Sequence, residues 1–316
     1  MRKAVINKND AGQRLDKFLF KYLKGVPASL LYRYIRTKRI KVNGKRCDIS
    51  YKLIEGDVLE LYINDELFSN EHKAIRKDAE NTPPDIVYED DNILLVNKPS
   101  GVIVHESDAD NNATLIDSIC AYLYKKGEYD PESEQSFAPA LCNRLDRNTS
   151  GIVICAKNAE ALRIMNEKIK QREIEKYYLC AAAGIFKKKS DTLKAYLIKD
   201  EKTNTVKVYD RPKSGAKTII TKYRVLKEKD DMSLLEVHLI TGRTHQIRAH
   251  LSHIGHPVIG DGKYGIGELN RRLGYNHQLL CSYKLAFGFS KNADALDYLN
   301  GREFEVKDVP FLKLFK

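Results

Sequence analysis

The stretch NRLDRNTSG, residues 143–151, precedes the apolar run IVICA at 152–156. The turn-forming Thr-Ser-Gly and the apolar run after it predict that a loop enters a strand here. This loop places one carboxylate, Asp146, between two cations, Arg144 and Arg147. Taken alone, an RLD triplet at a strand entry is more typical of a structural ion pair than of an active site.

Several further runs predict strands around this one, at 176–184, 193–198, 205–209, 217–226 and 233–240. Residues 85–105 predict two strands around a turn at Pro99–Gly101, and 111–126 and 158–171 predict helices. The number and variable spacing of the strands indicate a large, mainly antiparallel sheet flanked by helices. We therefore expect an α+β fold, in which residues 85–316 form one large domain.

The N-terminal part has a different pattern. Residues 13–24 predict a helix, and Ser29 is a candidate cap for a second helix over 30–39. A hairpin turn at Asn43-Gly44 and a strand at 55–63 follow. The second helix shows a basic outer face, made of Arg33, Arg36, Lys38 and Arg39. We expect a small domain of two helices and a small sheet at 1–63, joined by a polar linker at 64–84.

The charge distribution points to a polyanionic partner. The formal net charge is +11, and residues 1–63 hold fifteen Lys or Arg against six Asp or Glu. A fifth of the chain thus carries most of the excess, which favours a nucleic-acid-binding module over a membrane-binding surface. No apolar run is long enough for a membrane span, and the N-terminus lacks a secretory signal. A cytoplasmic protein is expected, in which six scattered cysteines are small, mostly buried hydrophobes.

Common cofactor motifs are absent from the sequence. There is no GxGxxG after a strand, no GxxxxGKS/T, no GxSxG and no HExxH. Four histidines cluster at 245, 250, 253 and 256, in a segment that predicts a helix ending at Gly255. No cysteine or well-spaced carboxylate completes a metal site with them, so we expect hydrogen-bonded or RNA-facing histidines. The sequence predicts neither a metal nor another cofactor.

Four blocks together change the interpretation of NRLDRNTSG. They are NILLVNKPSGVIVH at 92–105, RLDRNTSGIVICAKN at 144–158, EKYYLCAAAG at 175–184 and TGRTHQIRAHLSHIGHPVIGDGKYG at 241–265. In this order they resemble the pseudouridine synthases of the RluA type. The N-terminal segment resembles the small RNA-binding domain named after the fourth protein of the small ribosomal subunit, through RLDKFL at 14–19, IRTKRIKVNGK at 35–45 and EGD at 55–57.

The resemblance implies roles for particular residues. Asp146 would be the nucleophile, or would steer the base, with Arg248 as its ionic partner. Tyr178, selected over Tyr177 by its spacing from Lys176, would stack on the uracil and remove the proton from carbon 5. Leu145 and Ile247 would form apolar walls, and the expected RNA or substrate contacts are Arg144, Arg147, Arg243 and His245. The position before RLD is often His in the family and is Asn143 here, a departure expected to affect substrate contacts.

Several alternatives stay open. Large-subunit ribosomal RNA is the expected substrate, transfer RNA is the alternative, and a monomer is expected. The sequence is compatible with attack of Asp146 on either the sugar or the base. One rival function is a non-catalytic RNA-binding or ribosome-assembly factor. Another is a glycosidase-like hydrolase, which needs a second carboxylate about 5–10 Å away; no acidic residue in the four blocks is an obvious candidate.

Overall fold

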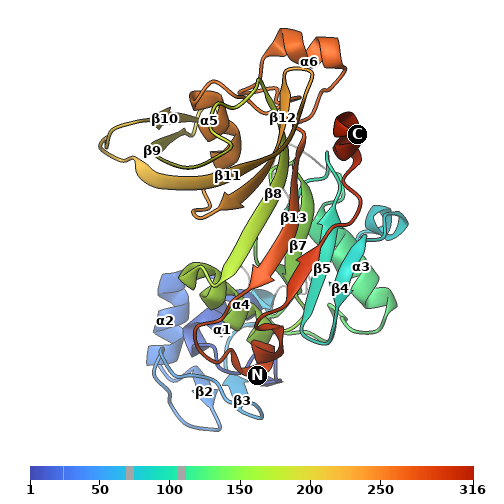
Figure 1. The fold of residues 1–316 in the computed structure, drawn as a ribbon. Coiled ribbons are helices and arrows are strands. Elements are labelled where there is room, and N and C mark those ends of the chain that lie inside the picture. Colours follow the sequence, from blue (N-terminus) through green and yellow to red (C-terminus); the bar gives the residue numbers. More distant parts are fainter. Residues whose placement is uncertain (24, 69–74, 106–111) are drawn as a thin grey trace.

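Two β-sheets organise the computed structural model, which describes residues 1–23, 25–68, 75–105 and 112–316 (Figure 1). The strands are β1 (Arg2–Val5), β2 (Ile40–Val42), β3 (Val58–Leu61), β4 (Ile86–Glu89), β5 (Ile93–Lys98), β6 (Ala140–Leu141), β7 (Ser150–Ala156), β8 (Ile174–Ala183), β9 (Ser190–Asp200), β10 (Thr205–Tyr209), β11 (Lys217–Lys229), β12 (Met232–Leu239), β13 (Leu280–Phe287) and β14 (Glu303–Glu305). The α-helices are α1 (Leu15–Tyr22), α2 (Ala28–Arg36), α3 (Leu115–Lys125), α4 (Ala159–Gln171), α5 (Gln246–His253) and α6 (Gly267–Leu273). Short 3-10 helices are η1 (Asp65–Leu67), η2 (Lys77–Asn81), η3 (Asp294–Leu299) and η4 (Pro310–Phe315).

The N-terminal module consists of β1, α1, α2, β2 and β3. Its three strands are antiparallel in the order β1-β3-β2, and the apolar faces of the two helices pack on them. Asn43 and Gly44 both have positive φ, at 50° and 73°, as a tight type I′ turn requires. The predicted pair of helices with a small sheet is thus confirmed. The predicted cap at Ser29 is wrong, because α2 already begins at Ala28 after Pro27, whose carbonyl accepts the Leu30 and Leu31 N–H groups.

The segment predicted as a linker, 64–84, is only partly described, because residues 69–74 lie outside the described ranges. In the described part, η1 and η2 interrupt the irregular chain. Phe68 belongs to the buried cluster of the N-terminal module, and η2 packs against α3. The described ends of this segment are therefore attached to the folded parts on either side. The predicted boundaries at 63 and 84 stay predictions.

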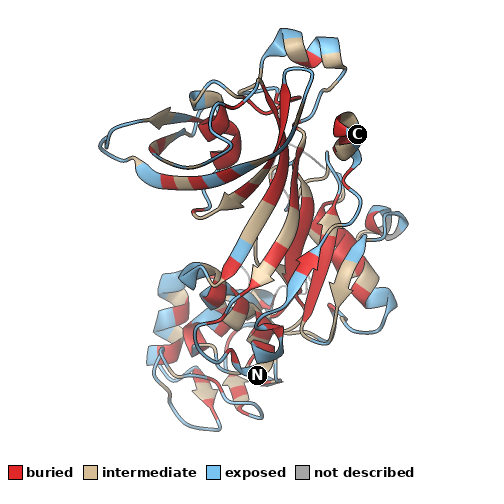
Figure 2. Ribbon diagram, viewed as in Figure 1, coloured by how far each residue is buried: buried red, intermediate tan, exposed pale blue. Residues whose placement is uncertain are grey.

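The second sheet has 11 strands, with the central order β10-β9-β11-β12-β8-β13-β7-β5-β4. Among the described strands β13 and β7 pair in parallel, and every other pair is antiparallel, which confirms the predicted mainly antiparallel sheet. Both faces of the central strands are covered, so the strands are largely buried (Figure 2). α3 and α5 pack on one face, and α4, η3 and η4 pack on the other.

The turn at Pro99–Gly101 is present, but the predicted arrangement of strands around it is wrong. β4 and β5 pair across a turn at residues 90–92, and residues 102–105, directly after Gly101, do not form a strand. Instead, the Pro99–Gly101 turn bonds to the loop before β7: the Gly101 N–H donates to Arg147 O, and Ser100 Oγ donates to Asn148 O. The polar groups of this turn are therefore satisfied by another loop rather than by a strand partner.

A polar seam joins the N-terminal module to the rest of the chain. Asn9 Nδ2 donates to Glu134 Oε1, and Ser136 Oγ donates to the fully buried Asp10 at its Oδ1. Arg163 of α4 donates to Ala11 O across the same seam. In Figure 1 the module accordingly lies beside α4. The module is docked on the rest of the chain through several hydrogen bonds with defined geometry.

None of the helices in the described ranges has the length and apolar character needed to cross a membrane.

Gly151 allows a close approach between β7 and β13 in the large sheet. It is the second residue of β7 and has φ of +112°, where the parallel neighbour β13 passes against it. A Cβ at this position would lie 2.2 Å from Ser282 O and 2.5 Å from Ser282 N, both backbone atoms. Only glycine satisfies both the conformation and the spacing, so this residue fixes how the loop containing Asp146 enters the sheet.

Replacing Gly151 by alanine should destabilise the protein severely. The left-handed backbone alone costs about 1–2 kcal/mol, and the backbone clash should raise the total loss to about 3 kcal/mol or more. Gly127→Ala is the matched control, because Gly127 also has positive φ but nothing within 4 Å of an added Cβ. Urea unfolding of both variants measures the difference, and equal losses would contradict the role of the close approach.

Candidate active site

The loop carrying Asp146 is fixed at both ends by hydrogen bonds. Asn143 Oδ1 accepts the Ile154 N–H at 2.7 Å, and Asn143 Nδ2 donates to Ile152 O at 3.3 Å. At the other end Gln278 donates to Thr149 Oγ1, and the Thr149 N–H donates to Asp146 O. Asn143 therefore brackets the backbone of β7, and the expectation that its substitution for His affects substrate contacts stays a prediction.

Lys98 is an anchor of this loop that the sequence analysis missed. Its side chain is fully buried, and its ammonium donates to the carbonyls of Pro99, Val102 and Arg147 at 2.8–2.9 Å. Burial lowers the pKa of Lys98 to about 8, against the attraction of Asp146. The Lys-Pro pair in NKPSG was recognised as part of a motif. The motif did not reveal that the Lys98 side chain hydrogen-bonds to the backbone of the RLD loop.

Arg248 holds two carboxylates at once. Its Nη1 donates to Asp146 Oδ2 at 2.8 Å, while Nε and Nη2 donate to Asp261 at 2.6 and 2.8 Å. Arg248 is 5% exposed and Asp261 is 1% exposed, whereas the Asp146 side chain is 27% exposed. The structure thus brings together Asp146 and Arg248, about a hundred residues apart, as predicted, and adds Asp261 to the pair.

Asp261 is the second carboxylate that the sequence analysis did not identify, although it lies in the fourth block. Burial by itself raises the pKa of Asp261, but the hydrogen bonds and charge of Arg248 outweigh burial and lower it. The N–H groups of Lys263 and Tyr264 also donate to Oδ1. Because Asp261 is engaged in this way, it orients Arg248 and is poorly suited to act as the second carboxylate of a hydrolase.

The two tyrosines of EKYYLC point to opposite faces of the sheet, as neighbours on a strand must. Tyr178 belongs to the buried cluster under α3 and α5, together with Leu145 and Ile247. Tyr177 lies on the other face, where it stacks on His238 and donates to Glu175. Burial, together with the charge of Asp146, raises the pKa of Tyr178 to about 12. Tyr178 is therefore the tyrosine on the side of Asp146.

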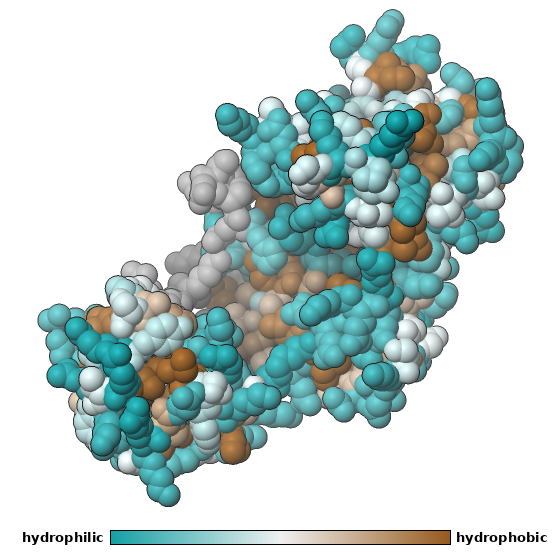
Figure 3. All heavy atoms as spheres, turned by 90° about the vertical axis from the view of Figure 1, so that its left-hand side faces the viewer, coloured by the Kyte–Doolittle hydropathy of each residue, from teal (hydrophilic) through white to brown (hydrophobic). Residues whose placement is uncertain are grey.

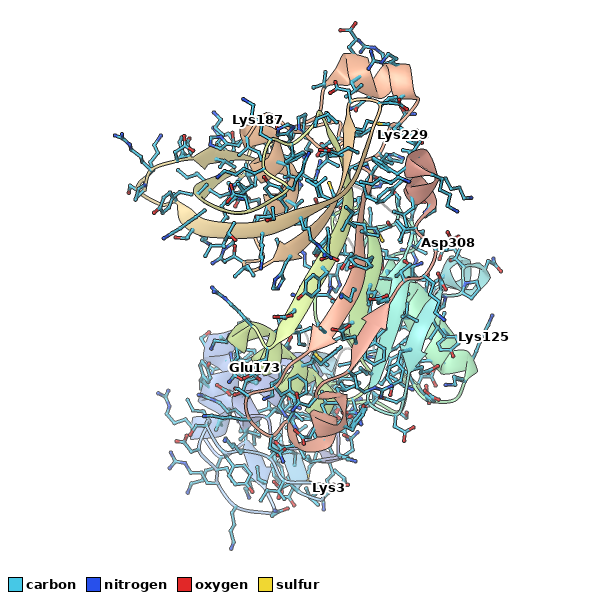
Figure 4. All side chains as sticks on the ribbon, in the orientation of Figure 1. Lys3, Lys125, Glu173, Lys187, Lys229 and Asp308 are labelled. Carbon is cyan, nitrogen blue, oxygen red and sulfur yellow. The ribbon has the colours of Figure 1, made fainter. Side chains whose placement is uncertain are left out.

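Figure 4 labels Glu173 and Lys187, which lie just beyond the two ends of β8. Glu173 is beside α4 near the N-terminal module, and Lys187 is on the part formed by β9, β10 and β11. Tyr178 lies in the middle of this strand, between those two parts. The molecular face on the left of Figure 1 is hollowed between the same two parts (Figure 3).

The predicted RNA-contacting cations are exposed. Arg33, Arg36, Lys38 and Arg39 are all exposed on α2 and the turn after it, and Arg144, Arg147 and Arg243 are exposed near the loop and α5. Arg147 Nε donates to Gly101 O, so this residue also contributes to fixing the loop. The cations thus form two separate groups, one on the N-terminal module and one near Asp146.

Each of the four clustered histidines has its own hydrogen-bond partner. His245 pairs with Tyr264, His250 with Thr221, His253 with Asp210 and His256 with Ala183 O. His250 is the most deeply buried of the four, with 2% of its surface exposed. Within the described ranges no group of three or more His, Cys, Asp or Glu side chains is arranged to hold a metal ion.

Comparisons with known proteins give two family matches for this chain. Residues 92–253 match the family model described as RNA pseudouridylate synthase, and residues 13–59 match that of the S4 domain. A ribosomal large subunit pseudouridine synthase C of Haemophilus influenzae is 32% identical, over 96% of this chain and 92% of the relative. An RNA pseudouridine synthase of Mycoplasma capricolum is 36% identical, over 96% of both chains.

Among solved structures, human RNA pseudouridylate synthase domain containing 4 matches with a TM-score of 0.56. The match covers 72% of this chain and 90% of the human chain at 22% identity. Human RNA pseudouridylate synthase domain containing 1 matches with a TM-score of 0.53 at 24% identity, over 76% of this chain and 96% of that one. At these identities the likeness shows a shared fold.

The Asp261–Arg248 pair should make stability depend on pH. The folded-state pKa of Asp261 is below its ordinary value of 3.8. The contribution of Asp261 to folding stability is therefore fully present above the pKa that this group has in the unfolded chain. It is lost as the pH falls through the pKa of Asp261 in the folded protein. We expect Asp261→Asn to cost about 3–5 kcal/mol at neutral pH, with the difference from wild type shrinking between about pH 5 and about pH 2.

Urea unfolding across this pH range measures the effect. Asp191→Asn is the control, because the Asp191–Lys188 pair is exposed to solvent and should matter little. A difference from wild type that stays constant with pH would show that charge is not what Asp261 contributes.

Proposed function

Because this chain belongs to the RNA pseudouridylate synthase family, we propose that it isomerises uridines of large-subunit ribosomal RNA with Asp146 as the nucleophile. The observation that carries the assignment of Asp146 is its bond to Arg248, which is itself held by Asp261. The RNA pseudouridine synthase activity follows from the family. The family assignment argues against the two rival functions, a non-catalytic assembly factor and a glycosidase-like hydrolase.

The contacts of Asp146 support its proposed role as the nucleophile. The Arg248 guanidinium places a positive charge beside the Asp146 carboxylate, with Nη1 donating to Oδ2 at 2.8 Å. Arg248 occupies Oδ2, and in the described part of the chain Oδ1 accepts no hydrogen bond. Attack on the sugar and attack on the base would both begin at this oxygen. Since uridine and pseudouridine are isomers, the overall reaction consumes no redox partner or nucleotide.

Tyr178 is proposed to stack on the uracil, between the apolar walls of Leu145 and Ile247. With a pKa of about 12, its phenol is protonated at neutral pH. A protonated phenol can stack and donate a hydrogen bond. To accept the proton from carbon 5, the phenol must first pass its own proton to another group.

RNA binding is assigned to the two groups of cations. A stacked uridine must be extruded to reach Asp146, at a cost of about a few kcal/mol, and phosphate contacts to the cations offset that cost. We assign residues 1–63 to RNA binding, 64–84 to the connection and 85–316 to catalysis. Ribosomal RNA is preferred over transfer RNA because curated relatives are named for the large ribosomal subunit. A cytoplasmic monomer stays a prediction.

Asp146→Asn should abolish pseudouridine formation, by at least about 10⁴-fold, because it removes the nucleophile but keeps its shape. The assay is tritium release from an unmodified large-subunit ribosomal RNA transcript labelled at uridine carbon 5. RNA affinity should change little, and Asp91→Asn, at an exposed position, is the control. Retained turnover would remove Asp146 from this role, and wild-type turnover on transfer RNA alone would change the substrate.

Neutralising the basic face of α2 should weaken RNA binding and its dependence on salt. With Arg33, Arg36, Lys38 and Arg39 changed to Gln, the slope of log affinity against log salt should fall by up to about 3. The control changes four exposed cations elsewhere, at Arg271, Arg272, Lys307 and Lys313. Filter binding across salt concentrations compares the two, and an unchanged slope in the α2 variant would contradict the assignment.

A further inference from the structure

His245 stands at the N-terminus of α5 with one ring nitrogen facing the candidate active site. Its backbone is left-handed, with φ of 53° and ψ of 19°. The turn is held by Gln246, whose Oε1 accepts from Thr241 Oγ1 and from the Arg243 N–H. In this position His245 Nε2 lies 3.9 Å from Asp146 Oδ2. A non-glycine residue in this conformation, beside a reactive group, is a candidate for function.

The other ring nitrogen belongs to a directional chain of hydrogen bonds. The backbone N–H of Val206 in β10 can only donate, and it donates to the Tyr264 hydroxyl oxygen at 2.8 Å. That hydroxyl lies 2.9 Å from His245 Nδ1. The arrangement that satisfies every group has the Tyr264 O–H donating to Nδ1. Neutral His245 then carries its proton on Nε2.

The Nε2–H group has no acceptor of its own in the described part of the chain. The separation of 3.9 Å from Asp146 is too long for a hydrogen bond. Nor is Nε2 among the buried polar atoms that lack a partner, so it reaches accessible space. His250 is different, because its ring is almost fully buried and bonds to Thr221 within the fold. His245 alone among the four directs a hydrogen-bond donor beside the Asp146 carboxylate.

We propose that His245 donates a hydrogen bond from Nε2 to an oxygen of the bound uridine, and that Tyr264 is the positioning residue that fixes its tautomer. This inference rests on the proposed function, because it adds a substrate contact to the Asp146 site. The acceptor is a ribose hydroxyl or a uracil carbonyl, both of which are neutral oxygens within the same nucleotide.

The charges around His245 are consistent with a neutral imidazole. Burial lowers the pKa of His245, and the cations Arg248 and Lys263 lower it further, against the attraction of Asp146 and Asp261. The Arg248 guanidinium also lies over the Tyr264 ring, with 5.3 Å between Cζ and the ring centre. One side chain therefore contacts both the partner of Asp146 and the proposed donor. Tyr264 was not identified from the sequence, although it lies in the GDGKYG end of the fourth block.

The tautomer is tested first on the free protein by nitrogen NMR of isotope-labelled histidine. The signal of His245 is identified by its loss in His245→Asn. At neutral pH the wild type should show a protonated Nε2 and an unprotonated Nδ1. In Tyr264→Phe the two nitrogens should move toward averaged values, which a merely structural role of Tyr264 would not produce. A protonated Nδ1 in the wild type would overturn the proposal.

The substrate contact is tested with two matched substitutions. Gln places a side-chain N–H near the position of Nε2, whereas Asn reaches only the position of Nδ1. Asn also tolerates left-handed backbone best among residues with a side chain, so its effect cannot be assigned to misfolding. In the tritium-release assay, His245→Asn should lower kcat/KM by about 10- to 100-fold. His245→Gln should retain most activity, and Tyr264→Phe should lose about 3- to 10-fold.

Thermal unfolding should be unchanged in both His245 variants, and RNA affinity should change little, because contacts to phosphates dominate it. Equal activity of the Asn and Gln variants, or wild-type activity of Asn, would overturn the proposal. A transcript carrying 2′-deoxyuridine separates the two acceptors, because the Asn effect disappears there if the ribose 2′-hydroxyl accepts. If the wild-type protein releases no tritium from any RNA, the proposed function fails instead, and the NMR result still decides the tautomer.

Discussion

The guanidinium of Arg248, shared between Asp146 and Asp261, is the interaction on which the site depends. A planar group with five donors can satisfy one carboxylate through Nε and Nη2 and still present Nη1 to another. A lysine could not divide its charge with this geometry. The fully buried Asp261 fixes the orientation, so the partly exposed Asp146 meets a cation that is already in place. The free-energy cost of burying the Arg248 charge is offset by interactions within the folded protein, so substrate binding does not have to offset it.

The backbone around Asp146 is equally constrained, by contacts that come from far along the chain. Lys98 donates a hydrogen bond to the Arg147 carbonyl of the RLD loop. Gly151 lets the β13 backbone occupy the space that a side chain would need at this position. Both residues act on the backbone, so neither contributes a reactive group. Their effect is to leave Asp146 few conformations, which is the positional precision that a covalent mechanism requires.

The sequence predicted those parts of the fold that depend on local pattern. Apolar runs located β7 through β12, and helical periodicity located α1 and α4, because burial imposes those periods directly. The motifs also paired Asp146 with Arg248. The sequence could not show which distant residues become neighbours in the fold when no local pattern marks them. Asp261, Tyr264 and the reach of Lys98 became visible only with the fold, and so did the bracketing role of Asn143.

The docked N-terminal module has a consequence for how a target is chosen. Because several hydrogen bonds join Asn9, Asp10 and Ala11 to Glu134, Ser136 and Arg163, the basic face of α2 is held at a fixed span from Asp146. A module on a loose tether would accept many separations between its binding point and the reacting base. A docked module accepts only one separation. The protein can therefore select the shape of the RNA between the basic face of α2 and Asp146, together with the base sequence at either place.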